Sequence, residues 1–380
     1  MIEIKEVKTC CQRRAFVNFP LKLYRDNEHY APLFYMDEKA LLSEKTNIYN
    51  DYTKSRFFLA YDEKGKVVGR VGAIVNYADI EKTGVKAMRF TRLDAVDDPA
   101  VFAALMGAVE DYAREEGMSL VHGPLGYNDM DKEGLLIEGY EYDETYGGVY
   151  NYPYYLPRLE ELGYSKEFDW IERKIYVGDK VDDRYVRMAE VVKNRYHFKE
   201  LIDNDMSTGS VIDTYADQIF ALLDEAYRKL HGTVPFTERA KKSMISGLRI
   251  IVKARYISCI ADESGKLVAF GLLLPAIWHA LRKSRGKLFP FGWWHLAKSL
   301  FIKHEGGAEH LLIGVLPEYQ NSGVNSLLFM DMFRKDHEGG IKWAESNAIL
   351  ETNSKMLGQF RDFDVNVNKR RRSYIKKLDY

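Results

Sequence analysis

Apolar residues recur along this chain with two spacings, one typical of helices and one typical of strands. Helical spacing marks four segments, 11–27, 36–47, 215–231 and 238–252. Each pair of these segments is followed by a strand–turn–strand pattern, RFFLAYDEKGKVV at 56–68 and RYISCIADESGKLV at 255–268. Both patterns turn on the sequence D-E-x-G-K and predict a β-hairpin.

The two halves of the chain continue in the same order after their hairpins. The matching helices are predicted at 99–116 and 323–336, the next strands at 118–122 and 341–344, and the last strands at 168–177 and about 370–378. An asparagine, Asn151 or Asn353, begins a helix before each last strand. The repeated order predicts two domains, 1–180 and 181–380, with a boundary near 178–184.

Composition describes a soluble globular protein and narrows its function. The chain has 380 residues, 46% of them hydrophobic and 29% charged, and a net charge of −1. This length favours two domains, and the near-neutral charge does not favour nucleic acid as a partner. No secretory signal and no apolar run long enough to cross a membrane is visible, so stable membrane insertion is not expected.

The cysteines and the metal-binding patterns complete this picture. Cys10, Cys11 and Cys259 are an odd set, two of them adjacent, which argues against a disulfide framework and for a reducing cytoplasm. No pattern typical of a metal site occurs.

One strand-to-helix turn carries candidate chemistry. The apolar run 311–316 stops at Pro317, a polar turn covers 318–322, and Gly323 precedes a helical pattern. The first backbone N–H groups of a helix have no intrahelical partners and favour an anion. Gly323 allows close approach of the backbone, and Ser322 can cap the helix. The turn therefore predicts either an anion site or an ordinary connection.

This turn and the order of elements resemble the Gcn5-related N-acetyltransferase (GNAT) superfamily, here as a tandem of two domains. The residues Gln320 to Asn325 match its Q/R-x-x-G-x-G/A motif, except that Asn325 stands at the last position. The resemblance implies an α/β (α+β) fold of two GNAT-like domains, each a mixed, mostly antiparallel sheet flanked by helices. It also implies acetyl-CoA or another acyl-CoA as co-substrate. The cofactor-binding residues it implies are Leu316, Gln320, Asn321, Ser322, Gly323, Val324, Asn325 and Asn353.

The corresponding turn of the first half is acidic. It reads LDAVDDPAVF, with Asp94, Asp97 and Asp98 around the helix start and Pro99 in place of a donor. Carboxylates suit the helix dipole themselves and compete with a phosphate. We expect that the first half does not bind coenzyme A and instead shapes the substrate cleft or supports the second half.

Catalytic candidates follow from the chemistry of acyl transfer to an amine, which needs a base and a way to release the thiolate. Glu345, after the strand 341–344, is the predicted base, although an exposed carboxylate is an equal alternative. The thiolate acid of the family, a tyrosine, is replaced by Phe360, and Tyr374 is a candidate substitute. The basic run Lys369 to Arg372 is interpreted as a solvated strand edge, or as a phosphate contact.

Two unusual segments are predicted to lie over the sheets. Residues 123–155 are acidic and rich in tyrosine, which suits a cationic amine or a packed loop. Residues 277–303 mix tryptophans with Arg282, Lys283, Arg285 and Lys287. A lid or interdomain contact is favoured over a membrane-surface helix, because Pro290 and Gly292 would interrupt any single helix in this segment.

The predicted function is that of an acyl-CoA-dependent N-acyltransferase, an N-acetyltransferase by resemblance, acting on an unidentified small-molecule amine. Two alternatives stay open: an acyl-CoA- or small-molecule-binding protein without turnover, and an aminoacyl-tRNA-dependent transferase-like protein. The near-neutral charge weakens the second.

Overall fold

The computed structural model describes residues 1–178, 183–203, 205–230, 232–302, 305–360 and 363–379. The first half contains, in order, β1 (Glu3–Glu6), α1 (Cys10–Leu23), α2 (Tyr35–Leu41), β2 (Thr53–Tyr61), β3 (Val67–Asn76), α3 (Tyr77–Thr83), β4 (Ala87–Ala95), α4 (Pro99–Glu115), β5 (Leu120–Gly123), β6 (Leu135–Glu138), α5 (Tyr155–Glu161) and β7 (Ser165–Tyr176).

The second half repeats this order with extra elements. It contains α6 (Asp183–Tyr196), β8 (Lys199–Glu200), α7 (Thr208–Tyr227), α8 (Glu238–Ile251), η1 (Ala254–Tyr256), β9 (Ile257–Ala261), β10 (Leu267–Pro275), α9 (Trp278–Ser284), α10 (Gly292–Ala297), η2 (Lys298–Ile302), β11 (Gly307–Val315), η3 (Pro317–Tyr319), α11 (Val324–Glu338), β12 (Trp343–Ser346), β13 (Ile349–Leu350), α12 (Ser354–Gln359) and β14 (Val365–Lys377). The predicted mixed, mostly antiparallel fold is confirmed.

Local chemistry explains why the predicted elements form where they do. In both hairpins an aspartate, Asp62 or Asp262, accepts backbone hydrogen bonds from the turn. The turn glycines Gly65 and Gly265 have φ of 74° and 88°, a conformation that other residues rarely adopt. At the start of α4, Asp98 accepts from the backbone N–H of Ala100 at 2.8 Å, and proline follows it.

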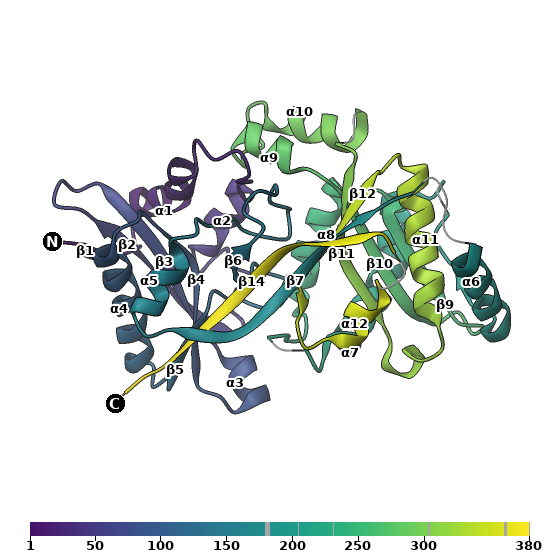
Figure 1. Ribbon diagram of the computed structural model, residues 1–380, viewed down its shortest axis with the longest axis horizontal. Coiled ribbons are helices and arrows are strands. Elements are labelled where there is room, and N and C mark those ends of the chain that lie inside the picture. The colour runs from purple at the N-terminus through teal and green to yellow at the C-terminus, as the bar shows by residue number, and fades with distance from the viewer. Residues whose placement is uncertain (179–182, 204, 231, 303–304, 361–362, 380) are drawn as a thin grey trace.

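The two halves share one continuous sheet, because each contributes its last strand to the other (Figure 1). β14, from the end of the chain, lies between β5 and β7 of the first half. β7, from the end of the first half, pairs in turn with β12 of the second. The long β7–β14 ribbon therefore joins the halves. The division at residue 180 stays a prediction, and its boundary near 178–184 lies mostly outside the described residues.

The basic run at 369–372 is not a solvated strand edge, because β14 is an interior strand. Lys369 and Arg371 are buried and pair with carboxylates of both halves. Arg372 is half-buried against Asp169 at 2.8 Å. The prediction was wrong because an edge strand and an interior strand with paired charges have the same local sequence.

Each half keeps its own apolar core. In the first half α4 covers β2, β3 and β4, and Phe90, Phe102 and Leu105 are fully buried there. In the second half α7 and α11 pack on opposite faces of β10 and β11. Gly271 of β10 faces Leu328 and Met332 of α11, whereas Gly314 of β11 faces Leu222 and Leu223 of α7.

Candidate active site

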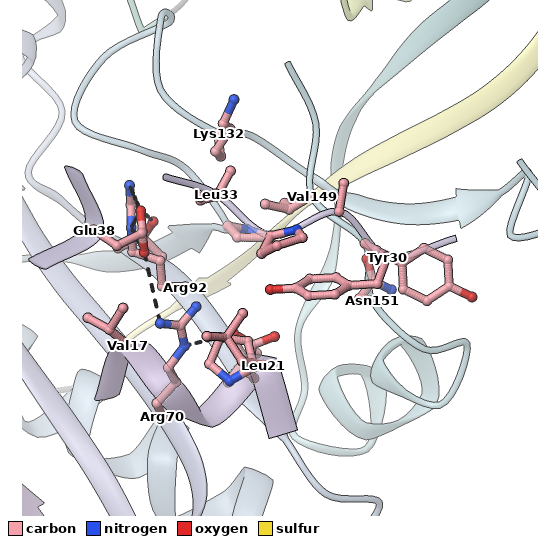
Figure 2. Close-up of a pocket in the computed structure, with 18 of the residues that line it drawn as sticks. Val17, Leu21, Tyr30, Leu33, Glu38, Arg70, Arg92, Lys132, Val149 and Asn151 are labelled. Atoms are coloured by element: carbon pink, nitrogen blue, oxygen red, sulfur yellow. Dashed lines mark hydrogen bonds and ion pairs between the residues drawn. The ribbon is translucent and has the colours of Figure 1, made fainter. Parts of the chain in front are cut away.

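The cavity of the first half is small and its polar wall is already paired. It holds about 60 Å³ between α1, the 30–33 loop, the start of α2, residues 91–94 of β4, and residues 132–135 and 149–151. Ligand pockets usually hold about 300–1,000 Å³. Figure 2 shows Arg70, Arg92 and Glu38 together on one side of this cavity. Arg92 pairs with Glu38 and Asp131 at 3.1 and 2.9 Å.

In the first half, side chains occupy the turn before α4 and the end of β4, where an anion and a ligand chain could otherwise bind. Asp94 pairs with Arg70 at 2.8 Å, and Asp97 pairs with Arg158 at the same distance. The hydroxyls of Tyr154 and Tyr155 occupy the backbone groups of Ala95 at the end of β4. That the first half does not bind coenzyme A stays a prediction.

The corresponding turn of the second half carries no charged side chain from 320 to 325. Gly323 has φ of 86° and immediately precedes α11. Ser322 accepts from the backbone N–H of Val324 at 3.2 Å, as a cap does. Gln320 and Asn321 are exposed, Leu316 and Val324 are buried, and Asn325 is half-buried. The one carboxylate of the turn, Glu318, pairs with Lys266 at 2.9 Å.

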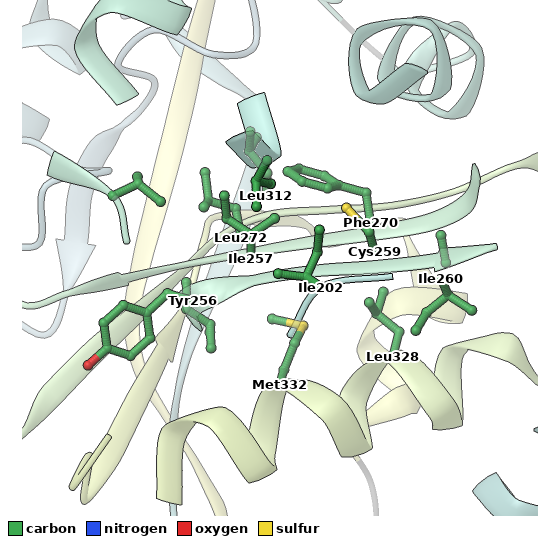
Figure 3. Close-up of a cluster of buried hydrophobic side chains, with 14 of the residues drawn as sticks. Ile202, Tyr256, Ile257, Cys259, Ile260, Phe270, Leu272, Leu312, Leu328 and Met332 are labelled. Carbon is green, nitrogen blue, oxygen red and sulfur yellow. The ribbon is translucent and has the colours of Figure 1, made fainter. Parts of the chain in front are cut away.

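The position of α11, and thus of its N-terminus, is fixed by apolar packing. Figure 3 shows Leu328 and Met332 pointing from α11 toward β9 and β10. Both side chains are buried among Ile257, Ile260 and their neighbours. Val192 of α6 lies so close to Gly323 that a Cβ there would come within 2.8 Å of it. A rigid helix start is what an anion site needs.

Beside this turn, β11 presents a backbone edge that no strand of the described residues covers. β11 pairs with β10 along its length but with β12 only at 307–310. Among the described residues, two side chains bind the remaining edge. Tyr227 donates to the carbonyl of Ile313 at 2.8 Å and accepts from its N–H at 3.3 Å, and Asn347 donates to the carbonyl of Leu311 at 3.3 Å.

Glu309 lies where β11 and β12 begin to separate. Its register with β10 directs it to the α7 face of the sheet, opposite α11. It is 4% exposed and accepts from the backbone N–H groups of Tyr146 and Gly147 at 2.7 and 3.0 Å. Burial raises its pKa from 4.5 to about 7. A carboxyl with this pKa can take a proton at neutral pH.

Glu345, the predicted base, lies next to Glu309 in the parallel pairing but is already paired. Its carboxylate binds the ammonium of Lys369 and accepts from Asn368 at 2.8 Å. Burial alone would lower the pKa of Lys369, but Glu345, Glu144 and Glu172 together raise it. Glu345 stays a prediction as the base, and the geometry favours Glu309.

The other predicted residues have structural surroundings. Tyr374 lies in the first half because β14 crosses, and its hydroxyl is 3.3 Å from Glu160. It is not brought to the Gly323 turn. Asn353 caps α12 by accepting from Met356 at 3.1 Å, and its coenzyme role stays a prediction. Phe360 is buried against Phe329 of α11.

A cavity of about 750 Å³ opens between the halves on the α7 side. Its walls come from α3, the 128–130 loop, α7 and the 233–236 loop, and they include Tyr227 and Asp129. Burial raises the pKa of Asp129 from 3.8 to about 6. The negative field of Asp129 also raises the pKa of Tyr227, after the larger effect of burial. The cavity therefore places a carboxyl and a phenol close to the free edge of β11.

In the described part of the chain, no group of three or more potential metal ligands lies together. None of the helices in that part combines the length and the apolar character that a membrane span requires.

The chain has full-length relatives among curated proteins. No family model matches it. Protein YghO of Escherichia coli K12 is 31% identical over 381 residues, which cover 96% of this chain and 93% of that protein. The chain belongs to the YghO family. A protein named bacterial ceramide synthase, from Caulobacter vibrioides, is 27% identical to this YghO-family chain over 378 residues, covering 93% of the chain and 92% of the relative.

Solved structures show the same fold. A tandem GNAT protein from the clavulanic acid biosynthesis pathway has a TM-score of 0.58 at 11% identity, covering 100% of this chain and 99% of that chain. A GCN5-related glucosamine N-acetyltransferase region of a fungal β-N-acetylglucosaminidase has a TM-score of 0.57 at 11% identity. It covers 99% of this chain and 38% of that one. The YghO-family chain thus has the tandem GNAT fold, as its motif and element order predicted.

Sequence reasoning missed Glu309, Tyr227 and the role of Asp129 at a cavity. Glu309 lies two positions before the apolar run of β11. An acidic residue at the start of an apolar strand was a sequence signal that could have marked it as a candidate site residue. Tyr227 carried none, because its partner is a backbone 86 residues away.

Proposed function

We propose that this YghO-family chain is an N-acyltransferase that takes an acyl group from acyl-CoA and transfers it to an amine. The observation that carries the proposal is the stretch of β11 at 311–315 that no described strand pairs beyond β10, where the side chains of Tyr227 and Asn347 bind, beside the uncharged start of α11 and with Glu309 at its inner end. The Caulobacter relative adds support. A ceramide is an amide of a fatty acid and an amino alcohol, so a ceramide synthase forms such a bond.

The residues that would bind the coenzyme and those that would bind the amine lie on different sides of the sheet. The N–H groups at the start of α11 would hold the pyrophosphate of the coenzyme. The edge at 311–315 would pair with its amide-bearing arm, releasing Tyr227 from Ile313. The amine would enter from the cavity on the α7 side, where Asp129 attracts a cation. When the amide C–N bond forms and the thioester C–S bond breaks, the amine gives up its proton to Glu309.

Tyr227 would protonate the leaving thiolate. Its phenol carries a proton at neutral pH, and its hydroxyl lies at Ile313, on the edge that the coenzyme arm would pair with. Tyr227 would thus act as the thiolate acid, a role that Phe360 cannot fill because its side chain has no proton to donate.

Coenzyme A should stabilise the protein, and charges added to the turn should abolish this. At a hundred times Kd a ligand adds about 2.7 kcal/mol, which raises Tm by roughly 3 °C for a chain of this length, since the unfolding entropy is about 2.1 cal/mol/K per residue. In Gln320→Glu/Asn321→Asp, each new carboxylate near a phosphate costs about 1–4 kcal/mol. We expect the shift to disappear in differential scanning fluorimetry.

Gln218→Glu, on the exposed side of α7, is the matched control and should keep the full shift. No shift of the unmodified protein with millimolar coenzyme A, acetyl-CoA or a long-chain acyl-CoA would refute the coenzyme site. Thiol release across a panel of amines then separates an enzyme from a binding protein.

Asp129→Asn should raise the KM for the amine by about 10- to 100-fold, since a hydrogen bond to a charged group contributes about 1.5–3 kcal/mol. The KM for acyl-CoA should not change and serves as the internal control. Because the pKa of Asp129 is about 6, amine binding by the unmodified enzyme should weaken below that pH as the carboxyl becomes neutral. Equal effects on both KM values would contradict this role.

A further inference from the structure

The segment between α9 and β11 divides into a docked part and an exposed part. Trp278 of α9 is buried beside Ala31 of the first half. Tyr35 donates its backbone N–H to the carbonyl of Gly286 at 2.8 Å, and Lys287 lies over the ring of Tyr35 at 4.8 Å. The predicted interdomain contact therefore exists at α9.

Residues 288–302 instead carry apolar side chains on both faces. Leu296 and Leu300 point inward and belong to the core of the second half. The outward face holds Phe289 and Phe291, which are 79% and 75% exposed, and Trp293 and Trp294, each 50% exposed. Phe301 and Ile302 continue it at 54% and 63%. A solvated helix normally turns polar residues outward, so this face has the composition of a contact surface.

The charged side chains within this segment have one sign. Residues 277–302 contain five cations and no aspartate or glutamate. Lys283, Lys287 and Lys298 are exposed, and Lys253 lies over the ring of Phe301 at 4.6 Å. Protruding tryptophan and phenylalanine with flanking lysine is the pattern of elements that enter the headgroup region of a bilayer. Figure 1 shows α10 at the outer rim of the molecule, above the sheet.

We propose that the exposed face of residues 289–302, named here the aromatic rim, docks this protein on the surface of a membrane that contains anionic lipid. The aromatic side chains would enter the interface between headgroups and acyl chains, while the lysines contact lipid phosphates. A membrane suits this surface better than a protein groove because the most exposed rings, Phe289 and Phe291, protrude from it. This inference does not depend on the proposed enzymatic activity.

The test is sedimentation of the full chain with vesicles of phosphatidylcholine alone and of equal parts phosphatidylcholine and phosphatidylglycerol. We expect binding to the anionic vesicles that weakens with salt. Phe289→Ser/Phe291→Ser/Trp293→Ser/Trp294→Ser should bind roughly tenfold or more weakly, because the apolar area that enters the bilayer is lost. Lys283→Gln/Lys287→Gln/Lys298→Gln should lose the preference for anionic lipid, by roughly fivefold per lysine.

Three further measurements keep the result specific. Phe289→Ser/Phe291→Ser changes only the two most exposed rings, so it should fold even if the fourfold variant does not. Tyr77→Ser/Tyr196→Ser removes two exposed rings on α3 and α6 and should bind as the unmodified protein does. Brominated lipid should quench tryptophan fluorescence in the unmodified protein and much less in Trp293→Phe/Trp294→Phe.

Either of two outcomes would overturn the proposal. One is equal sedimentation of the Phe289→Ser/Phe291→Ser variant and the unmodified protein with anionic vesicles. The other is absence of vesicle binding together with self-association that the same variant abolishes, which would assign the aromatic rim to a second copy of this chain.

Discussion

Glu309→Gln should lower kcat/KM for acyl transfer by about 10²- to 10⁴-fold, the usual contribution of a general base. Glutamine has nearly the same shape and can still accept from Tyr146 or Gly147, but it cannot take a proton. In the unmodified enzyme kcat/KM should rise with pH through about 7, the raised pKa of Glu309. The variant should lose this rise. Both profiles can be measured by thiol release at saturating acyl-CoA.

Glu110→Gln is the matched control, because Glu110 is also buried but lies in the first half, bonded to Tyr164 and Lys376. It should keep the activity and its pH profile. Glu345→Gln tests the base predicted from sequence. Full activity of Glu309→Gln with an unchanged profile, together with loss in Glu345→Gln, would reassign the base to Glu345.

The same carboxyl makes stability depend on pH in a defined direction. Its pKa is higher in the folded protein than in the unfolded chain, so folding favours the protonated form. The stabilisation is complete below about pH 4.5 and is lost as pH rises through about 7. Unfolding in urea at several pH values should show this loss in the unmodified protein and less of it in Glu309→Gln.

Arg371→Met should destabilise the protein by about 3–5 kcal/mol, the cost of leaving buried charges unpaired. Arg371 joins the two halves: it pairs with Glu172 of β7, and with Glu144 of the 139–150 loop at 2.6 Å. It also donates to the carbonyl of Val149 at 2.5 Å. Without the guanidinium, both carboxylates stay buried beside Lys369, which is already bound to Glu345 and lies 3.8 Å from Glu172. Urea unfolding followed by circular dichroism measures the loss.

The neighbouring Arg370 provides the control. Its nearest carboxylate, Glu138, is 4.0 Å away and mostly exposed, so Arg370→Met should cost about 1 kcal/mol or less. Replacing Glu144 and Glu172 with leucine in the Arg371→Met protein should recover part of the stability, because the unpaired charges are then gone. Equal losses in Arg370→Met and Arg371→Met would contradict the buried network.

The parts of the site that sequence reasoning found depend on local chemistry. The D-E-x-G-K hairpins need a glycine with positive φ and an aspartate that bonds the turn, and both requirements act within five residues. The turn at Gly323 is of the same kind, since its glycine and its serine cap are contiguous in sequence. Such features are readable because the interactions that form them lie within one or two turns of chain.

The parts that sequence reasoning missed depend on partners far along the chain. Lys369 and Arg371 read as surface cations, and only carboxylates from β7, β12 and the 139–150 loop make their burial possible. Tyr374 falls in the first half because β14 crosses to it. The sequence also could not decide whether Trp293 and Trp294 are exposed, since a lid and a membrane-binding surface have the same mixture of aromatic side chains and lysines.

By itself the sequence determined two repeats of one order of elements, an uncharged helix start in the second, and an acidic one in the first. Hydrophobic periodicities and turn residues depend on interactions between residues close in sequence, so they can be recognised without knowledge of the fold. Only the tertiary structure decided that the halves exchange their last strands, that Glu345 is ion-paired with Lys369 whereas Glu309 accepts from backbone N–H groups, and that the aromatic rim faces outward. These outcomes follow from strand order and burial, which depend on backbone pairing between residues far apart in sequence.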